Sequence, residues 1–159
     1  MAIYMKLENI EGDVTAAGHE KWVQLEKLQF STKRSLTAEP GRIADREATR
    51  PSISEFLIEK RMDKSTPLLF SESCVGKAKS ELKIEICQTG TNLIPYMQYT
   101  LYNVIISAYQ VNALYNEYPS ESINLSFDRI EMRYTPFDEK NQAESPIPAG
   151  YDLKKAIAI

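Results

Sequence analysis

The stretch Tyr96–Val111, YMQYTLYNVIISAYQV, is the longest β-rich run of the chain and decides its fold class. Aromatic and β-branched residues dominate it, and these residue types favour strands. Three apolar residues, Val104, Ile105 and Ile106, follow one another at its centre. We expect this centre to be buried on both faces, because a strand with one solvated face alternates apolar and polar residues.

Shorter strands with a period of two lie on both sides of this run. Apolar and polar residues alternate in 3–7 and in 82–86, and Phe56 and Ile58 mark a further strand between them. Such alternation is typical of half-buried strands. The chain is therefore expected to be mainly β.

Two of the β-rich runs change phase by one residue. In 22–30 the apolar parity shifts between Leu25 and Leu28, and in 123–134 it shifts at 128–129. A one-residue shift is typical of a β-bulge, which bends a strand. Two bulged strands in one small domain favour a closed or strongly curled sheet. The predicted fold is a β-barrel of two curled antiparallel sheets, or a sandwich with the curvature of a barrel.

One segment, 66–75, has the signals of a short α-helix. Thr66 suits the N-cap, Pro67 suits the first helical position, and Gly76 suits the position after the last turn. Five apolar side chains lie within it: Leu68, Leu69, Phe70, Cys74 and Val75. Because these are too apolar for full exposure, the helix should flank the barrel and cover an opening or face of it.

The C-terminal segment has the composition of an irregular tail. Residues 136–150 combine three prolines and a glycine with polar residues, which is typical of a connection. Residues 151–153 could return as a short final strand.

The composition is that of an ordinary globular protein. A length of 159 residues fits one domain over 1–159, with 43% hydrophobic and 26% charged residues. A pI near 5.3 argues against non-specific binding of nucleic acid. No apolar run approaches the roughly 18 residues that a transmembrane helix needs, so we expect no membrane insertion.

The start of the chain and its cysteines indicate a compartment. Residues 1–8 alternate in polarity and lack the basic and apolar regions of a cleaved signal peptide. Two cysteines, Cys74 and Cys87, are too few for a disulfide scaffold. We expect synthesis and folding in a reducing cytoplasm, and any export by a route without a cleaved signal.

Signals of catalysis are weak. His19 is the single histidine, and neither a G-x-S-x-G elbow nor a phosphate-binding glycine pattern occurs. His19 and the two cysteines lack the close spacing of metal ligands. We expect His19 to pack beside Trp22 and the cysteines to be small core residues. No enzyme activity, catalytic residue, metal or cofactor is predicted.

A long segment, 31–52, has neither helical nor strand periodicity. Its five basic and three acidic residues give it a charge of +2, so the rest of the chain carries −5. Nucleic-acid binding would call for aromatic residues in the segment, which has none. A solvated loop and a protein-docking arm both remain possible, and the basic charge favours docking on the acidic body of another copy. The residues predicted to dock are Arg34, Leu36, Arg42, Ile43, Asp45, Arg46 and Arg50.

Eight segments in order along the chain resemble the haemolysin-coregulated proteins (Hcp), the tube proteins of bacterial type VI secretion systems. The segments are Met1–Lys6, Gly18–Trp22, Ala44–Ala48, Met62–Pro67, Tyr99–Ser107, Glu121–Phe127, Tyr134–Pro136 and Gly150–Leu153. No single segment is decisive, since 63–67 is mainly good capping chemistry. Their order over nearly the whole chain makes the resemblance specific.

The resemblance implies a β-barrel with one flanking helix that assembles into hexameric rings. The rings stack into an inner tube that is itself exported to the extracellular space or a target cell. Sheath, spike and baseplate proteins would be its partners, and small effector proteins would travel in the ring lumen. The long loop would contribute to contacts within or between rings. From strand parity, Gln24, Glu26 and Gln29 are expected to face the lumen.

Two other functions are compatible with the residues. One is a monomeric β-barrel that binds a small apolar ligand, which would need a hollow interior. The other is a hydrolase that uses His19, for which no local signature is present.

Overall fold

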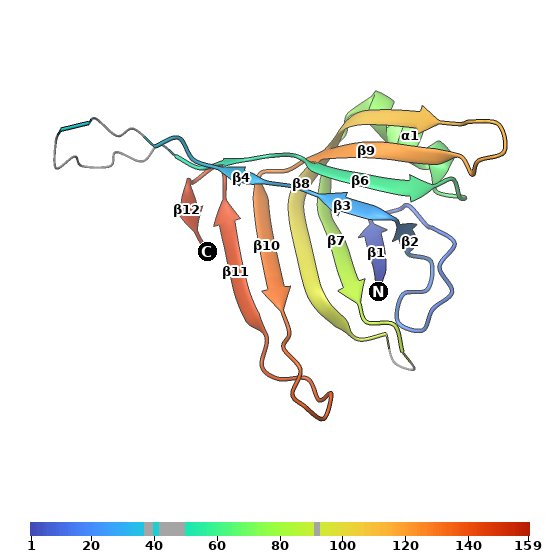
Figure 1. Cartoon of the computed structure of the whole chain (residues 1–159). Helices are drawn as coiled ribbons and strands as arrows, with labels where there is room; N and C mark the ends of the chain where they lie inside the picture. Colours follow the sequence, from blue (N-terminus) through green and yellow to red (C-terminus); the bar gives the residue numbers. More distant parts are fainter. Residues whose placement is uncertain (37–39, 42–49, 91–92) are drawn as a thin grey trace.

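The computed structural model describes residues 1–36, 40–41, 50–90 and 93–159, and these contain twelve strands and one helix. Figure 1 shows their arrangement. In chain order they are β1 (Ala2–Leu7), β2 (Val23–Leu25), β3 (Lys27–Gln29), β4 (Thr32–Lys33), β5 (Ser52–Ile53), β6 (Phe56–Arg61), α1 (Thr66–Val75), β7 (Lys79–Cys87), β8 (Pro95–Asn112), β9 (Ser120–Ser126), β10 (Arg129–Tyr134), β11 (Ile147–Asp152) and β12 (Ile157–Ala158).

The strands form two curled antiparallel sheets that share β8. The large sheet has the order β12-β11-β10-β8-β7-β1-β2, and the small sheet has the order β3-β6-β9-β8. Strand β8 serves both sheets because it bends between its halves (Figure 1). Asn103 has a φ of 54° at this bend, a conformation that asparagine tolerates better than most residues. The predicted fold class is confirmed.

From the sequence, two shifts of apolar parity are interpreted as β-bulges. In the structure, both are places where the chain passes from one sheet to the other. At Glu26 it passes from β2, paired with β1, to β3, paired with β6. At 127–128 it passes from β9 in the small sheet to β10 in the large one, so the expected single long strand is two strands. The physical reason is the bend of β8, since β9 and β10 pair with different halves of it. Among the described residues the hydrogen-bonded strands do not close into a complete ring, because β2 pairs with β1 and β3 pairs with β6, with no pairing between β2 and β3.

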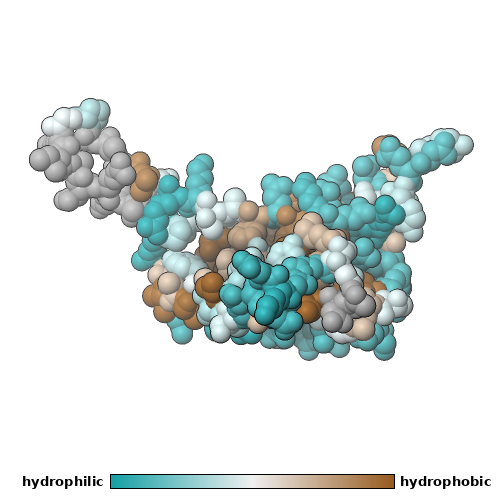
Figure 2. Space-filling model, turned by 60° about the horizontal axis from the view of Figure 1, so that its bottom comes forward, coloured by the Kyte–Doolittle hydropathy of each residue, from teal (hydrophilic) through white to brown (hydrophobic). Residues whose placement is uncertain are grey.

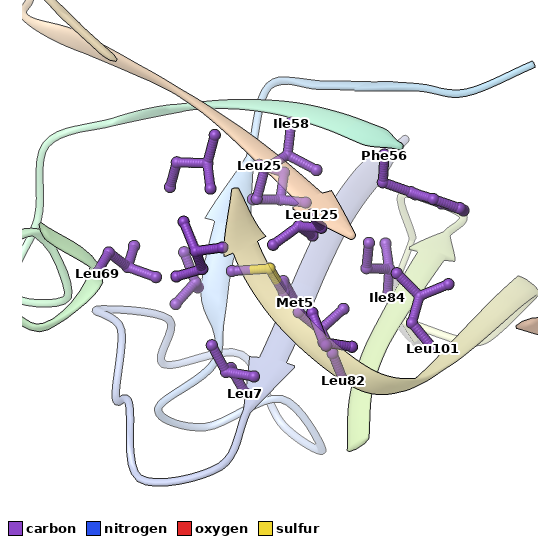
Figure 3. Packing of buried hydrophobic residues seen from close by; sticks show 14 of the residues in the cluster. Met5, Leu7, Leu25, Phe56, Ile58, Leu69, Leu82, Ile84, Leu101 and Leu125 are labelled. Atoms are coloured by element: carbon purple, nitrogen blue, oxygen red, sulfur yellow. The ribbon is translucent and has the colours of Figure 1, made fainter. Parts of the chain in front are cut away.

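The core lies between the inner faces of the two sheets (Figure 3). Met5, Leu82 and Leu101 come from the large sheet, and Phe56 and Leu125 come from the small one; all are fully buried. On each strand every second residue faces the core. The period of two in the sequence therefore separates core-facing residues from surface residues. At the centre of β8 the expectation was partly wrong: Val104 and Ile106 are buried, but Ile105 is 37% exposed.

Helix α1 covers β8, and its range agrees with the prediction. Its cap differs by one residue, because Ser65 occupies the N-cap position and Thr66 begins the helix. The Thr66 hydroxyl is engaged elsewhere, since it accepts the Asp63 backbone N–H at 3.1 Å and donates to Glu121 at 3.0 Å. Gly76 ends the helix in the left-handed conformation, as predicted.

Two further expectations need correction. Of the five apolar helix residues only Leu69 is buried, because α1 offers a single contact face to the barrel. The irregular tail is shorter than predicted, because β11 begins at Ile147 and pairs with β10, and β12 follows it. The described residues contain no helix of the length and hydrophobicity that a membrane crossing requires.

Candidate functional site

The arm predicted from 31–52 leaves the body through a short two-stranded ribbon. Strand β4 pairs with β5, and the Ser54 backbone N–H donates to Ser31 O at 2.9 Å. The Ser31 backbone N–H donates in turn to Ser54 Oγ at 2.8 Å. These strands have no periodic signal in the sequence because each has only two residues. The ribbon fixes where the arm starts and ends.

Three of the predicted docking residues lie in the described part of the arm. Arg34 and Arg50 are exposed next to the ribbon, and the side chain of Leu36 is 58% exposed. An exposed leucine beside two arginines has the chemistry of a docking element. The other four, Arg42, Ile43, Asp45 and Arg46, lie outside the described residues.

The outer face of the small sheet carries polar side chains in rows that cross the strands. In one row Lys27, Glu59, Ser122 and Gln110 are paired side by side on β3, β6, β9 and β8. Lys27 Nζ lies 3.1 Å from Glu59 Oε1 within this row. The next row consists of Gln29, Leu57, Asn124 and Ala108. The face is thus mainly polar, with Leu57 and Ala108 among its polar side chains, and it has little net charge.

The three residues predicted to face a lumen are all exposed, but they lie in different places. Gln29 is on β3, in the outer face of the small sheet. Gln24 is on β2 in the large sheet, and Glu26 lies where the chain changes sheet, with Oε1 2.5 Å from Arg61 Nε. Lys27 lies on the same strand face as Gln29 but was not predicted to do so, since the pairing of β3 with β6 was not known from the sequence.

The small sheet ends in two strands that have one side without a strand partner among the described residues. These are β3, which pairs with β6, and the second half of β8, which pairs with β9. Unpaired strand edges offer backbone N–H and C=O groups to another chain. Because the sheet has four antiparallel strands, its two edges run in opposite directions. The edge of one copy can therefore pair antiparallel with the other edge of the next copy.

A buried group of charges fixes α1 to the small sheet. Lys60 and Glu121 form an ion pair with both side chains fully buried, and Lys60 Nζ also lies 3.0 Å from Asp63 Oδ1. Glu121 accepts hydrogen bonds from Thr66 in α1 and from the Tyr109 hydroxyl. Burial and the neighbouring Glu121 carboxylate raise the pKa of Tyr109. The group has the satisfied hydrogen bonds of a structural ion pair.

His19 lies in the loop between β1 and β2, and its side chain is buried. Its ring centroid is 4.7 Å from those of Tyr4 and Trp22, so the predicted packing beside Trp22 is confirmed. The structure also brings Glu85 and Cys87 of β7 against His19, with Nε2 2.6 Å from Glu85 Oε2. Sequence reasoning missed this contact, since about 66 residues separate the partners along the chain. Cys87 is buried as predicted, whereas Cys74 is exposed on α1.

A family model and a curated relative both match this chain over most of its length. Residues 4–134 match the family model described as type VI secretion system effector, Hcp. Protein hcp1 of Pseudomonas aeruginosa is 21% identical over 158 residues, covering 98% of this chain and 96% of that protein.

Solved structures share the fold over nearly the whole chain. A type six secretion system protein superposes with a TM-score of 0.93 at 24% identity, covering 99% of both chains. Hcp1 from Salmonella typhimurium superposes with a TM-score of 0.81 at 19% identity, covering 99% of this chain and 98% of that one. The family model spans most of the chain and the fold agrees with it. The chain therefore belongs to the Hcp family of type VI secretion system proteins.

Proposed function

We propose that this protein is the subunit of a type VI secretion tube. In this proposal it assembles into hexameric rings, the rings stack into the inner tube, and the tube is exported with small effectors in its lumen. The observation that carries the proposal is the small sheet with two open edges and an uncovered polar outer face. Membership of the Hcp family supports the same reading.

Ring formation would use the two edges of the small sheet. The β3 edge and the β8 edge are different surfaces, so a contact between them is heterologous and repeats with one rotation per copy. Such a contact either closes into a ring or continues as a filament. Antiparallel pairing of β8 in one copy with β3 in the next would extend the small sheet around a closed ring.

The outer face of the small sheet would then line the lumen. In this proposal Gln29 would face the lumen together with Lys27, Glu59, Ser122 and Asn124, which lie on the same face of the small sheet. A face of amides, hydroxyls and a paired lysine and glutamate offers hydrogen bonds without a large apolar patch. It would hold a folded effector weakly enough to release it. Gln24 and Glu26 would lie beside the β3 edge rather than at the centre of this face.

Stacking of rings would use the arm. The β4–β5 ribbon and the β8–β9 hairpin project from opposite ends of the molecule, as Figures 1 and 2 both show. In a head-to-tail stack the arm of one ring would meet the hairpin end of the next. That end carries the exposed apolar residues Leu114, Tyr115 and Tyr118. Arg34, Leu36 and Arg50, together with Arg42, Ile43, Asp45 and Arg46, would dock there.

Membership of the Hcp family supports the proposed partners and location. Sheath, spike and baseplate proteins would act on the tube, and the subunit would fold in the bacterial cytoplasm before export. The protein would have no catalytic role. A monomeric ligand-binding barrel is the weaker candidate, because aliphatic and aromatic side chains from both sheets fill the interior in one cluster.

The proposal is tested by the assembly state of the purified full chain. We expect rings in negative-stain electron micrographs and a hexamer mass by light scattering. A matched pair of variants locates the contact. Ser107→Lys and Gln110→Lys together add charge to the β8 edge strand and should reduce rings, whereas Lys77→Glu and Lys140→Glu should leave them unchanged. A monomer at every concentration would contradict the proposal.

A further inference from the structure

Three potential metal ligands from two distant parts of the sequence, the loop before β2 and strand β7, lie close together. We propose that His19, Glu85 and Cys87 form a binding site for a divalent cation of the zinc class. Their ligand atoms all lie within 4.8 Å of one another. His19 Nε2 is 2.6 Å from Glu85 Oε2 and 3.7 Å from Cys87 Sγ. This inference does not depend on the proposed tube function.

The fold holds the ligands in place without a cation. Glu85 and Cys87 are two residues apart on β7, which sets them on the same side of the strand. His19 is fixed through its backbone, since its N–H donates to Ala16 O at 2.9 Å and its carbonyl accepts the Trp22 N–H at 3.1 Å. The imidazole also lies between the rings of Tyr4 and Trp22. Such preorganisation lowers the cost of forming a site.

The contacts of the imidazole point toward the same place. Its Nε2 faces both Glu85 and Cys87, whereas Nδ1 is buried and has no hydrogen-bond partner among the described residues. All polar contacts of the ring in the described structure are therefore on the side of the proposed cation.

The donor set selects the kind of ion. Imidazole nitrogen, thiolate sulfur and carboxylate oxygen are the three ligand types of protein zinc sites, and a thiolate disfavours magnesium and calcium. A neutral imidazole, a carboxylate and a thiolate carry two negative charges, which a divalent cation cancels. Binding would break the S–H bond of Cys87 and release its proton to solvent. The occupied site would thus be neutral, as a buried position requires.

Gln98 and a neighbouring cavity lie beside Glu85 in the proposed site. Gln98 Nε2 donates to Glu85 Oε1 at 2.8 Å and so orients the other carboxylate oxygen toward His19. Partners of this kind tune metal affinity. Glu85 and Gln98 line a cavity of about 520 Å³ on the outer face of the large sheet. Of the three proposed ligands only Glu85 lines this cavity, so a cation and a water molecule as fourth ligand would have to reach the site from the side of the carboxylate.

The experiment uses Co²⁺ and Zn²⁺ with the full-length chain carrying Cys74→Ser, so that Cys87 is the only thiol. We expect one equivalent of Co²⁺ to bind with a thiolate-to-metal charge-transfer absorption band. Adding Cys87→Ser should abolish the band and weaken Zn²⁺ binding, measured against a chromophoric chelator. Gln98→Leu should keep the band and weaken binding about tenfold.

The alternative is a hydrogen-bonded cluster that binds no cation. Absence of the band in folded Cys74→Ser protein would overturn the proposal, as would equal Zn²⁺ affinity with and without Cys87. Circular dichroism checks that each variant is folded. If Cys87→Ser does not fold, Glu85→Gln tests the site instead, because it keeps the shape of the side chain and removes the negative charge of the ligand. Unchanged affinity in Glu85→Gln would overturn the site.

Discussion

Lys60 and Glu121 lie directly opposite each other on β6 and β9, and their side chains form an ion pair with no exposure to solvent. Both residues point into the barrel, where the sequence pattern places apolar residues. The pair is satisfied by Asp63 on the lysine side and by Thr66 and Tyr109 on the glutamate side. It therefore connects the small sheet, the start of α1 and β8 in one polar group.

Replacing one member of this pair should destabilise the protein strongly. Glu121→Ala would leave the Lys60 ammonium buried without its main partner, and we expect a loss of about 3–5 kcal/mol in the free energy of unfolding. Urea denaturation followed by circular dichroism measures this. The control is Glu59→Ala, whose partially exposed pair with Lys27 should contribute no more than about 1 kcal/mol. Equal effects of the two variants would show that burial of the pair has no energetic role.

The raised pKa of Tyr109 should make stability fall at alkaline pH. The folded state keeps this phenol protonated, whereas the unfolded chain ionises near pH 10. The stabilisation is therefore fully present below about pH 10 and is lost as pH rises from there toward the higher folded pKa. Urea titrations between pH 8 and 11 should show a smaller alkaline loss for Tyr109→Phe than for the unchanged chain. Tyr115→Phe, at an exposed position, is the control and should follow the unchanged chain.

Charge reversal in the arm should weaken stacking and leave folding intact. Arg42→Glu with Arg46→Glu changes the charge of the arm by four units in the negative direction, so docking on an acidic body becomes repulsive. Electron microscopy should show single rings in place of short stacks, with an unchanged melting curve. Lys77→Glu with Lys140→Glu makes the same charge change elsewhere and should leave stacks intact. Stacks of normal length in the arm variant would exclude an electrostatic role.

The two cysteines should differ in reactivity. Cys74 is exposed on α1, whereas Cys87 is buried, and burial together with Glu85 raises the pKa of Cys87 to about 11. The thiolate is the reactive form, so Cys87 should stay unmodified at pH 8. A disulfide-exchange reagent should modify Cys87 only after denaturant is added, as seen by mass spectrometry of Cys74→Ser. Rapid labelling of Cys87 in the folded protein would contradict its burial.

The exposed isoleucines of the C-terminal strands offer a further contact for the proposed ring. Ile147, Ile157 and Ile159 are exposed on or beside β11 and β12, and Figure 2 shows hydrophobic atoms on the side where these strands lie in Figure 1. We expect Ile157→Asp with Ile159→Asp to reduce ring formation, since a covered apolar patch would gain two charges. Light scattering compares the mass of this variant with that of Leu114→Asp at the hairpin end. The comparison shows which of the two surfaces contributes to ring formation. Unchanged ring mass in the first variant would show that this patch lies outside the ring contact.

Much of the fold could be predicted because local chemistry decides it. The alternation in β1, β6 and β7 marks which side chains face the core, and Pro67 and Gly76 bracket α1. The shifts of apolar parity near Glu26 and Asp128 do mark bends of the chain, but local sequence could not show what kind of bend each one is. A change of parity is compatible with a bulge or with a change of sheet, and only the bend of β8 decides between them.

The candidate site was less predictable than the fold. Gln29 could be placed on a polar strand face from parity, yet the rows that join it to Leu57 and Asn124 depend on strand pairing. The burial of Lys60 and Glu121 could not be read from parity, because charged residues are normally assigned to the surface. Their mutual pairing across two strands makes the exception stable.

The sequence by itself determined that the chain is mainly β, that one short helix follows β6, and that the segments of the Hcp family occur in order. Each of these depends on the chemistry of neighbouring residues. Tertiary structure alone decided which strands share a sheet, which edges remain open, and that His19 meets Glu85 and Cys87. These relationships join residues far apart in the chain, and no local periodicity encodes them because pairing of distant strands sets them.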